Sequence, residues 1–424
     1  MESDNFEEIA KKTKTASKQM AVLKTELKNI ALLSIAEEIE KNKDRIIQAN
    51  FSDLKFAESL LSAGEITKSV YNRLKLDENK LRDMIQGIVD VYELEDPIGK
   101  IIFQRELDEG LILTKISCPI GVLGIIFEAR PDVITQISAL AIKSSNSVIL
   151  KGGKEAFNTN KTIMEIIQNA LDKIEDFPKN VLNQVYTRDD VSKMLSQDKY
   201  IDLIIPRGGN NLVQFVKNNT KIPVLGHADG ICHIYIDEEA DYNKAKNIVI
   251  DSKTQYPSAC NSVETLLIHK NFDRSKDLLN ELKNADIELV NNPESWHKEY
   301  SDKILAYKFV ESFDEAIEHI NTYSSGHTDA IITENRECAN KFMIAIDSAG
   351  VYHNASTRFA DGFRYGFGAE IGISTNKTHA RGPVGLEGLT IYKYTLQGYG
   401  NIVKDYVDGT KSFNHRDLLW KLGF

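Results

Sequence analysis

Cys260 is the residue of this sequence best suited by its surroundings to act as a nucleophile. It lies in the segment YPSACNSVETLLIHK, Tyr256 to Lys270, where small residues precede the sulfur and an apolar, β-branched run follows it. This pattern predicts a loop whose end is fixed by a strand, and a thiol held in that way is a candidate nucleophile. The alternative is a core cysteine, because free cysteine is among the most buried residue types. The local pattern leaves both interpretations open.

Two other segments place glycines and basic residues directly after a predicted strand. In SVILKGGKEAF, Lys151 and Lys154 flank Gly152-Gly153, and in IPRGGNN, Arg207 precedes Gly208-Gly209. Ligands of open α/β sheets bind at the carboxyl ends of strands, glycines let the backbone approach them, and a helix N-terminus favours an anion. The repeated layout favours a nucleotide phosphate site over a solvated turn. The usual GxGxxG and GxxxxGKS/T motifs are missing, which argues against kinases and ordinary Rossmann dehydrogenases.

Arginines gather in two further segments. Arg130 precedes Pro131 in FEARPDV, at another predicted strand end, where it could grip a carboxylate or phosphate with two hydrogen bonds. The glycine-rich stretch 354–389 contains Arg358, Arg364, His379 and Arg381. Long loops of this kind are usually functional or disordered, and their arginines suit an acidic ligand. The alternatives are a surface salt bridge for Arg130 and a structural role for His379.

The pattern of secondary structure changes near residue 119. Residues 5–93 have apolar positions at helical spacing, and residues 101–117 predict a hairpin around Asp108-Glu109-Gly110 that needs a partner. Two stretches of alternating strands and helices follow, up to about residue 373, and predict mostly parallel sheets covered on both faces. The predicted strands are 121–127, 147–151, 182–186, 201–206, 222–226, 231–237, 263–268, 306–310, 328–332 and 349–353. The predicted helices of the first stretch are 132–144, one from about 155, 189–197 and 210–218.

Composition narrows the class of protein. The 424 residues carry a net charge of -10, which argues against nucleic acid or an anionic membrane as the main partner. Four cysteines lie far apart without CxxC or Cys/His spacing, so we expect no disulfide framework and no metal site. The acidic start has no apolar signal region, and no run is long enough to span a membrane. We therefore expect a cytoplasmic protein.

Seven segments together resemble the gamma-glutamyl phosphate reductase family of the aldehyde dehydrogenase superfamily. They are YPSACNSVE, GVLGIIFEARPDV, NSVILKGGKEA, IPRGGNNLV, HADGICHIYID, NASTRFADG and KTHARGPVGLEGL. The resemblance runs to about Tyr394 and implies an α/β fold with two Rossmann-like α/β domains and a small β oligomerisation element. By this resemblance, residues 1–100 and 119–226 form the cofactor-binding domain and 227–373 the catalytic domain. Residues 101–118 and 385–424 form the oligomerisation element.

The resemblance also implies a reaction. It is the reduction of L-glutamate 5-phosphate by NADPH to L-glutamate 5-semialdehyde and phosphate, the second step of proline biosynthesis, through a thioester on Cys260. The implied catalytic residues are Cys260, Asn261 and Arg130, and the implied substrate-binding residues are Arg358, His379 and Arg381. HADG (227–230) lacks the Glu that activates water in hydrolytic aldehyde dehydrogenases, so we expect no hydrolysis of the thioester.

The cofactor-binding residues implied are Lys151, Gly152, Gly153, Lys154, Arg207, Gly208, Gly209 and Glu299. Lys154 stands where the superfamily pattern K-P-S-E has a Glu, which favours the 2′-phosphate of NADP over NAD, and Glu299 matches the ligand of the nicotinamide ribose. The implied partners are the substrate, further copies of the chain and a separate glutamate 5-kinase. Two rivals stay open: a hydrolytic or coenzyme-A-acylating aldehyde dehydrogenase, and a binding or redox-sensing protein that uses Cys260.

Overall fold

A computed structural model describes residues 6–226 and 229–419 of the chain. The chain divides into two compact units. Unit 1 comprises Met1–Ile205, Asn219–Val224 and Gly385–Phe424, and unit 2 comprises Pro206–Asn218 and Leu225–Val384. The predicted nucleotide turn at Lys151 lies in unit 1, and Cys260 lies in unit 2.

Unit 1 begins with the predicted amphipathic helices, which are confirmed. They are α1 (Phe6–Met20), α2 (Thr25–Lys41), α3 (Lys43–Ser62), α4 (Lys68–Leu74) and α5 (Glu78–Glu93). In α5 the buried residues are Leu81, Met84, Ile88 and Val91, at the three- and four-residue spacing of one helix face. The Asp77 side chain accepts a hydrogen bond from the Lys80 N–H and caps this helix.

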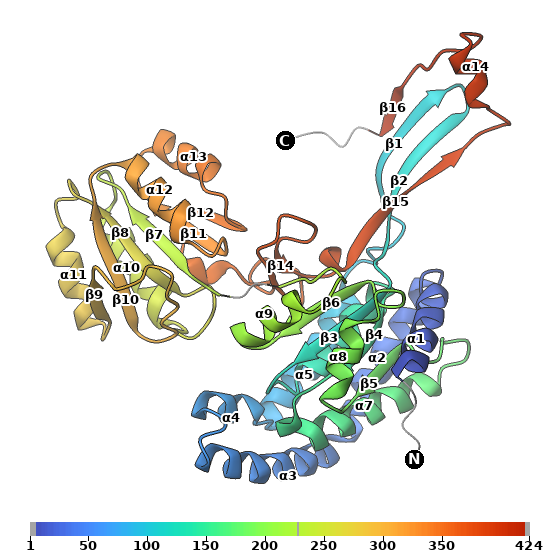
Figure 1. Cartoon of the computed structure of the whole chain (residues 1–424), viewed down its shortest axis with the longest axis horizontal. Coiled ribbons are helices and arrows are strands. Elements are labelled where there is room, and N and C mark those ends of the chain that lie inside the picture. Colours follow the sequence, from blue (N-terminus) through green and yellow to red (C-terminus); the bar gives the residue numbers. More distant parts are fainter. Residues whose placement is uncertain (1–5, 227–228, 420–424) are drawn as a thin grey trace. The chain divides into compact units, whose positions relative to one another are not determined.

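A four-stranded parallel sheet forms the core of unit 1, in the order β5-β4-β3-β6 (Figure 1). Its strands are β3 (Val122–Phe127), β4 (Ser147–Lys151), β5 (Leu182–Val185) and β6 (Leu203–Arg207). Its helices are α6 (Val133–Lys143), the 3-10 turn η1 (Lys154–Ala156), α7 (Phe157–Asp172) and α8 (Asp189–Leu195). Every residue of β3 is buried, as expected of a strand with both faces covered.

The predicted strand at 222–226 is wrong. Val224 makes only a single parallel bridge with Ile204. The Ile204 N–H donates to the Pro223 carbonyl, but Pro223 has no N–H to return to a ladder, which limits pairing at this sheet edge.

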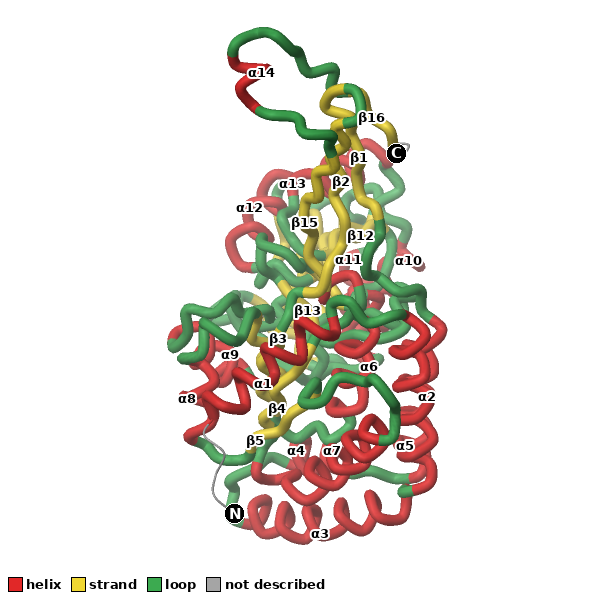
Figure 2. Tube along the Cα trace, turned by 90° about the vertical axis from the view of Figure 1, so that its right-hand side faces the viewer, coloured by secondary structure: helices red, strands yellow, loops and turns green. Residues whose placement is uncertain are grey.

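A second sheet of unit 1 is antiparallel, in the order β15-β2-β1-β16 (Figure 2). Its strands are β1 (Ile101–Asp108), β2 (Leu111–Pro119), β15 (Thr390–Gln397) and β16 (Arg416–Leu419), and α14 (Val403–Val407) lies between the last two in sequence. The predicted hairpin is confirmed, with Gly110 at a φ of 71° in its turn. Its partners β15 and β16 were not predicted. Because β15 pairs with β2 and β16 pairs with β1, residues 101–118 and the C-terminal segment share one sheet.

Unit 2 contains a six-stranded parallel sheet in the order β12-β11-β7-β8-β10-β9. Its strands are β7 (Cys232–Ile236), β8 (Val263–His269), β9 (Glu288–Asn291), β10 (Ile304–Val310), β11 (Thr328–Ile332) and β12 (Gly350–His353). Its helices are α9 (Asn210–Asn218), α10 (Tyr242–Thr254), α11 (Ser275–Asn284), α12 (Phe313–Tyr323) and α13 (Arg336–Ala345). The central strands β7 and β8 are buried throughout, and β9, which is partly exposed, was not predicted.

Short elements form much of the glycine-rich stretch 354–389. They are η2 (Thr357–Phe359), β13 (Gly372–Ser374), β14 (Gly382–Val384) and η3 (Glu387–Leu389). Two parallel α/β sheets and a small antiparallel sheet confirm the predicted α/β fold class.

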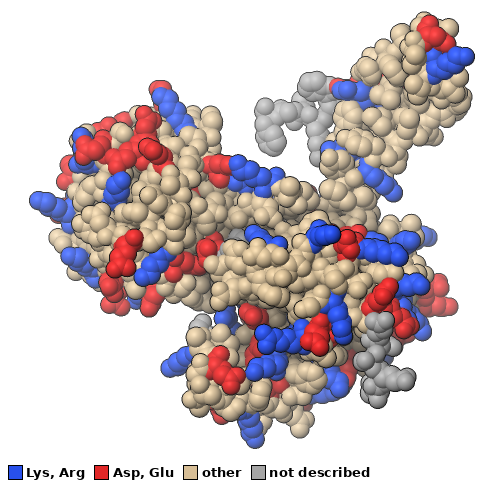
Figure 3. Space-filling view, in the orientation of Figure 1, with Lys and Arg blue, Asp and Glu red and all other residues tan. Residues whose placement is uncertain are grey.

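Charge is mixed over the face shown in Figure 3, where basic and acidic side chains alternate without one continuous basic area. Among the helices of the described residues, none has both the length and the apolar character needed to cross a bilayer. Within the same residues, no three His, Cys, Asp or Glu side chains come together in a way that could hold a metal ion.

Candidate active site

Cys260 lies in the loop between α10 and β8 and is partly exposed. The loop is closed by two turn hydrogen bonds, from Ala259 N–H to the Tyr256 carbonyl (3.1 Å) and from Ser262 N–H to the Ala259 carbonyl (2.8 Å). All residues of β8 are buried, so the strand that follows anchors this loop in the core. Cys260 is therefore an accessible thiol on a fixed loop rather than a core cysteine.

Gly230 lies directly against the backbone of Cys260. A Cβ atom at Gly230 would lie 2.1 Å from the Cys260 carbonyl oxygen and 2.4 Å from its Cα, which no side chain could tolerate. The buried Cys232 Sγ also donates to that carbonyl oxygen, over 3.4 Å. Only glycine therefore allows the start of β7 to pack so closely behind the nucleophile. His227 and Ala228 of the HADG segment lie outside the described residues.

Asn261 fastens the Cys260 loop to the segment NASTRFADG. Its buried side-chain Nδ2 donates to the Ala360 carbonyl (2.8 Å), and its own carbonyl accepts from Thr357 Oγ1 (2.7 Å). Ser252 and Ser356 extend this contact with a hydroxyl–hydroxyl hydrogen bond of 3.0 Å. These small hydroxyl residues were missed as site residues. Ser356 and Thr357 belong to the recognised segment NASTRFADG, whose Ser and Thr were the available signal, whereas Ser252 lies in α10.

Arg358 lies within electrostatic range of Cys260. Its Nε donates to Gln255 Oε1 (2.9 Å), and only 7% of the residue is exposed. Burial lowers the pKa of Arg358, the nearby Arg364 lowers it further, and Cys260 opposes both effects. Among the three predicted substrate-binding residues, Arg358 thus interacts electrostatically with Cys260.

Arg381 and His379 have other surroundings. The Arg381 guanidinium lies 3.0 Å from the Asp347 carboxylate and donates to the Asp347 carbonyl (2.8 Å). Lys377 first and Arg381 second lower the pKa of Asp347. His379 is exposed and precedes a cis peptide bond to Ala380. Arg381 is therefore paired with Asp347, which is not part of the Cys260 loop.

Glu299 is linked to Cys260 by Gly230, which contacts both residues. Its Oε2 accepts a hydrogen bond from the Gly230 N–H over 3.1 Å. Gly230 thus contacts both the Glu299 carboxylate and the backbone of the nucleophile. Cys260, Asn261, Glu299 and Arg358 therefore form one cluster within unit 2.

The predicted phosphate turn of unit 1 is built at the end of β4. Lys151 ends the strand half-buried, and burial is the main reason that its pKa is lowered, against the opposing effect of Glu155. A Cβ at Gly152 would lie 2.3 Å from Asn160 Nδ2, and one at Gly153 would lie 1.9 Å from Glu155 Oε1. The added atom at Gly152 would meet the buried side chains of Asn160 and Phe127, whereas at Gly153 it would meet the end of the flexible Glu155 side chain, which could move away.

Glu155 joins this turn to the segment of Arg130. Its Oε1 accepts from the Ala129 N–H (2.6 Å), where Ala129 has a φ of 48°. Arg130 is half-exposed directly after this residue. Lys154 is 70% exposed, and its Nζ lies 3.4 Å from Glu65 Oε2. Because such a surface pair contributes little, Lys154 can exchange Glu65 for a ligand phosphate.

The second glycine turn has a different environment from the first. Arg207 ends β6, but a Cβ at Gly372 would lie 3.1 Å from its guanidinium, so Arg207 packs on the start of β13. Gly208 and Gly209 follow, and a Cβ at Gly209 would meet nothing within 4 Å. The similar sequences thus lie in different units, with Arg207 in unit 2 and Lys151 in unit 1.

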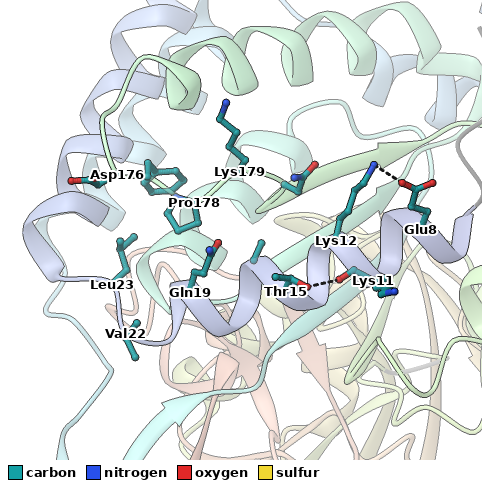
Figure 4. Close-up of a pocket in the computed structure, with 13 residues that line it drawn as sticks. Glu8, Lys11, Lys12, Thr15, Gln19, Val22, Leu23, Asp176, Pro178 and Lys179 are labelled. Carbon is teal, nitrogen blue, oxygen red and sulfur yellow. Dashed lines mark hydrogen bonds and ion pairs between the residues drawn. The ribbon is translucent and has the colours of Figure 1, made fainter.

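A cavity of about 790 Å³ opens on unit 1 between α1 and residues 176–180 (Figure 4). Lys12 and Lys179 are among the residues that line it, and Lys12 pairs with Glu8 at 2.9 Å. None of the predicted site residues lines this cavity. It is therefore separate from the cluster around Cys260.

Comparison with known proteins places the chain among enzymes. Residues 1–295 match the model of the aldehyde dehydrogenase family. The gamma-glutamyl phosphate reductase of Brachyspira hyodysenteriae is 58% identical, over 97% of this chain and 99% of its own length. That of Acetivibrio thermocellus is 52% identical, over 98% of each chain.

Solved structures agree with these relatives. The crystal structure of gamma-glutamyl phosphate reductase from Thermotoga maritima has a TM-score of 0.90 at 40% identity, covering 94% of this chain and all of its own. An acetylating aldehyde dehydrogenase from Geobacillus thermoglucosidasius has a TM-score of 0.67 at 17% identity, with coverage of 94% and 97%. At that identity the second likeness concerns the fold alone.

Proposed function

Since the chain belongs to the aldehyde dehydrogenase family and, within it, to the gamma-glutamyl phosphate reductases, we propose that it reduces L-glutamate 5-phosphate with NADPH. The products are L-glutamate 5-semialdehyde and inorganic phosphate, and the reaction is the second step of proline biosynthesis. The observation that carries the proposal is the partly exposed thiol of Cys260 on a fixed loop, within electrostatic range of the Arg358 guanidinium.

Cys260 forms the covalent intermediate. Its thiolate attacks C5 of the acyl phosphate, the C–S bond forms, and the C–O bond to phosphate breaks, so that inorganic phosphate leaves and a thioester remains. Arg358 supports this step because its positive charge attracts the anionic substrate toward the thiol. The N–H of Cys260 is the proposed donor to the developing oxyanion, in a loop that Gly230 and Asn261 hold in place.

The second half of the reaction reduces the thioester. NADPH, when bound, supplies the hydride for this step. The resulting tetrahedral carbon stays bonded to Cys260 Sγ until the C–S bond breaks, which releases the aldehyde and restores the thiolate. The sequence HADG lacks the Glu that would activate water, and this supports transfer to the aldehyde level without hydrolysis.

The residues of the β4 turn fit the phosphates of a dinucleotide. Gly152 and Gly153 keep the backbone accessible, and Lys151 adds a half-buried positive charge. Lys154 is the proposed ligand of the 2′-phosphate, because its exposed ammonium is paired with a surface carboxylate that a phosphate could replace. Glu299 is the proposed ligand of the nicotinamide ribose, and Arg207, Gly208 and Gly209 stay proposed cofactor residues.

The remaining catalytic and substrate-binding assignments are proposals of the same kind. Arg130 is proposed to hold the phosphate or the oxyanion, and Asn261 to support the oxyanion. His379 and Arg381 are proposed to bind the substrate, for which Arg381 would have to exchange Asp347 for a substrate anion. We keep the assignment of residues 1–100 and 119–226 to the cofactor and of 227–373 to catalysis.

We propose that residues 101–118 and 385–424 join copies of the chain into a homo-oligomer. The strand β15 pairs with β2 on one side, and its Tyr392, Tyr394 and Leu396 side chains are exposed. Exposed apolar side chains on an edge strand are typical of a subunit contact. A glutamate 5-kinase is the proposed supplier of the acyl phosphate, and the four free cysteines suit the reducing cytoplasm.

The phosphate requirement of the reverse reaction tests the proposed function. A cysteine thioester in a site without a hydrolytic base needs phosphate as the acyl acceptor. Oxidation of L-glutamate 5-semialdehyde with NADP, followed at 340 nm, should therefore rise with inorganic phosphate and fall to background without it. Oxidation at the same rate without phosphate would instead identify a hydrolytic enzyme, and a requirement for coenzyme A would identify an acylating one.

A further inference from the structure

A buried ion pair lies beneath the Cys260 loop. Lys253, near the end of α10, and Glu264, the second residue of β8, are both fully buried, and their Nζ and Oε2 atoms are 2.9 Å apart. Burial raises the pKa of Glu264 and lowers that of Lys253. A well-packed apolar pair often stabilises a core as well as two buried charges do. Stability alone therefore does not explain why this ion pair is buried beneath the Cys260 loop.

Glu264 has a second bond that an apolar residue could not make. The same Oε2 atom accepts a hydrogen bond from the Tyr300 N–H over 3.1 Å. Tyr300 belongs to the loop between β9 and β10, which has no regular secondary structure at this point. The buried carboxyl group thus fixes a main-chain position of a loop that has no strand or helix to hold it.

The residue next to Tyr300 is Glu299, which reaches the start of β7. While Tyr300 N–H bonds to β8 through Glu264, Glu299 Oε2 accepts from the Gly230 N–H at 3.1 Å. Two adjacent residues are therefore held by two neighbouring parts of unit 2, Tyr300 by β8 and Glu299 by the residue two positions before β7. Loss of either hydrogen bond would let the Glu299 carboxylate move relative to Cys260, whose backbone touches Gly230.

The same loop is held a few residues earlier by ring contacts with α12. The Trp296 ring meets His319 edge-on, with centroids 4.8 Å apart, and His297 lies 5.1 Å from Tyr323. Such pairs stabilise a contact beyond the burial of their area. Residues 296–300 are thus fixed at one end by α12 and at the other by Glu264.

We propose that Glu264, kept in place by Lys253, is a positioning residue that presents Glu299 to the nicotinamide ribose. The inference rests on the proposed function, because it takes Glu299 as a ligand of NADPH. It assigns Glu264 no contact with substrate or cofactor. The consequence is specific: loss of the bond to Tyr300 weakens NADPH binding, while the reactivity of Cys260 is kept.

A matched pair of double variants tests this role. Lys253→Met with Glu264→Gln removes both charges but keeps an oxygen that can accept from Tyr300 N–H, whereas Lys253→Met with Glu264→Leu removes the acceptor as well. NADPH affinity is measured by fluorescence titration, without turnover, and Cys260 reactivity by the rate of iodoacetamide alkylation. We expect the Leu variant to bind NADPH about tenfold more weakly than the Gln variant. The two alkylation rates should agree within about twofold.

Equal NADPH affinities of the two double variants would overturn the proposal, and so would an equal fall in alkylation and binding. If either double variant does not fold, Trp296→Ala decides, since it loosens the other end of the loop without changing the buried pair. Weaker NADPH binding by Trp296→Ala supports the positioning role, and unchanged binding by this variant refutes it. A wild-type protein that binds NADPH but oxidises the semialdehyde without phosphate would contradict the proposed function and leave the positioning role standing.

Discussion

Gly230 and Cys260 approach so closely that a Cβ atom on the glycine would lie 2.1 Å from the cysteine carbonyl oxygen. The same glycine donates its N–H to Glu299 over 3.1 Å. One residue without a side chain therefore sets the distance between the nucleophile and a proposed cofactor ligand. The backbone of Cys260 cannot be displaced without moving the start of β7.

Gly230→Ala should displace the Cys260 loop, because the nearest atoms belong to the backbone and not to a flexible side chain. A shift of about 1 Å at a reacting atom can lower the rate about 100-fold, and we expect a loss of that size in kcat/KM. Steady-state kinetics with L-glutamate 5-semialdehyde, NADP and phosphate measure it.

Gly87→Ala is the matched control for this substitution. Gly87 lies inside α5, where a Cβ would meet nothing within 4 Å, so alanine fits and stabilises the helix by about 1 kcal/mol. Its kcat/KM should equal that of the wild type. Full activity of Gly230→Ala would show that the close contact does not position Cys260.

Cys260→Ala should abolish turnover, with at least a 1,000-fold loss, while thermal unfolding stays close to that of the wild type. The side chain is partly exposed, so its removal leaves no deep cavity. Cys338→Ala serves as the control, because Cys338 lies on α13 with its Sγ 3.6 Å from Asp237 and is partly exposed as well. Retained turnover in Cys260→Ala would show that Cys260 is not the nucleophile.

Much of the fold could be predicted because its strands are buried on both faces. The runs at β3, β4 and β8 are short, apolar and bounded by Gly, Asn or Ser, so their type followed from the local sequence. The strand β15 could not be identified in this way. Its apolar and polar residues are exposed, and it exists because Thr390 to Gln397 pair with a strand some 280 residues earlier.

The site shows the same limit at the level of single residues. Cys260 was identifiable because a small-residue loop before a strand is a local pattern. The contact between Gly230 and Cys260 is not local, since it depends on β7 lying beside β8. Arg358 and Arg381 look alike in the sequence, and only the folded chain pairs Arg381 with Asp347 and leaves Arg358 near the thiol.

Lys154→Glu should reduce the preference for NADPH over NADH by about tenfold or more. The substitution replaces an ammonium that could bind the 2′-phosphate by a carboxylate that repels it, and a charge-assisted hydrogen bond contributes about 1.5–3 kcal/mol. The ratio of kcat/KM for the two cofactors measures the change.

Lys12→Glu provides the control for net charge. Lys12 is exposed on α1 beside the cavity of Figure 4 and has a surface ion pair with Glu8, much as Lys154 has with Glu65. It should leave the cofactor ratio unchanged. An equal effect of both substitutions would point to overall charge, and no effect of Lys154→Glu would exclude Lys154 as the 2′-phosphate ligand.

His319 should make the protein sensitive to acid. Its ring is buried on α12, both ring nitrogens lack a hydrogen-bond partner among the described residues, and burial first and His233 second lower its pKa to about 3. The native state therefore binds fewer protons than the unfolded chain, whose histidine has a pKa of about 6.5. The contribution of His319 to stability is complete above pH 6.5 and is lost as the pH falls toward 3. At pH 5 the loss is about 2 kcal/mol.

Urea unfolding at pH 7.5 and pH 5 measures this effect. His319→Phe keeps a ring for Trp296 to contact but cannot take up a proton, so the free energy of unfolding should fall by about 2 kcal/mol less than in the wild type between these pH values. His297→Phe, which replaces an exposed histidine of the neighbouring loop, should follow the wild type. An identical fall in wild type and His319→Phe would show that the buried ring is protonated without cost and that other groups govern acid unfolding.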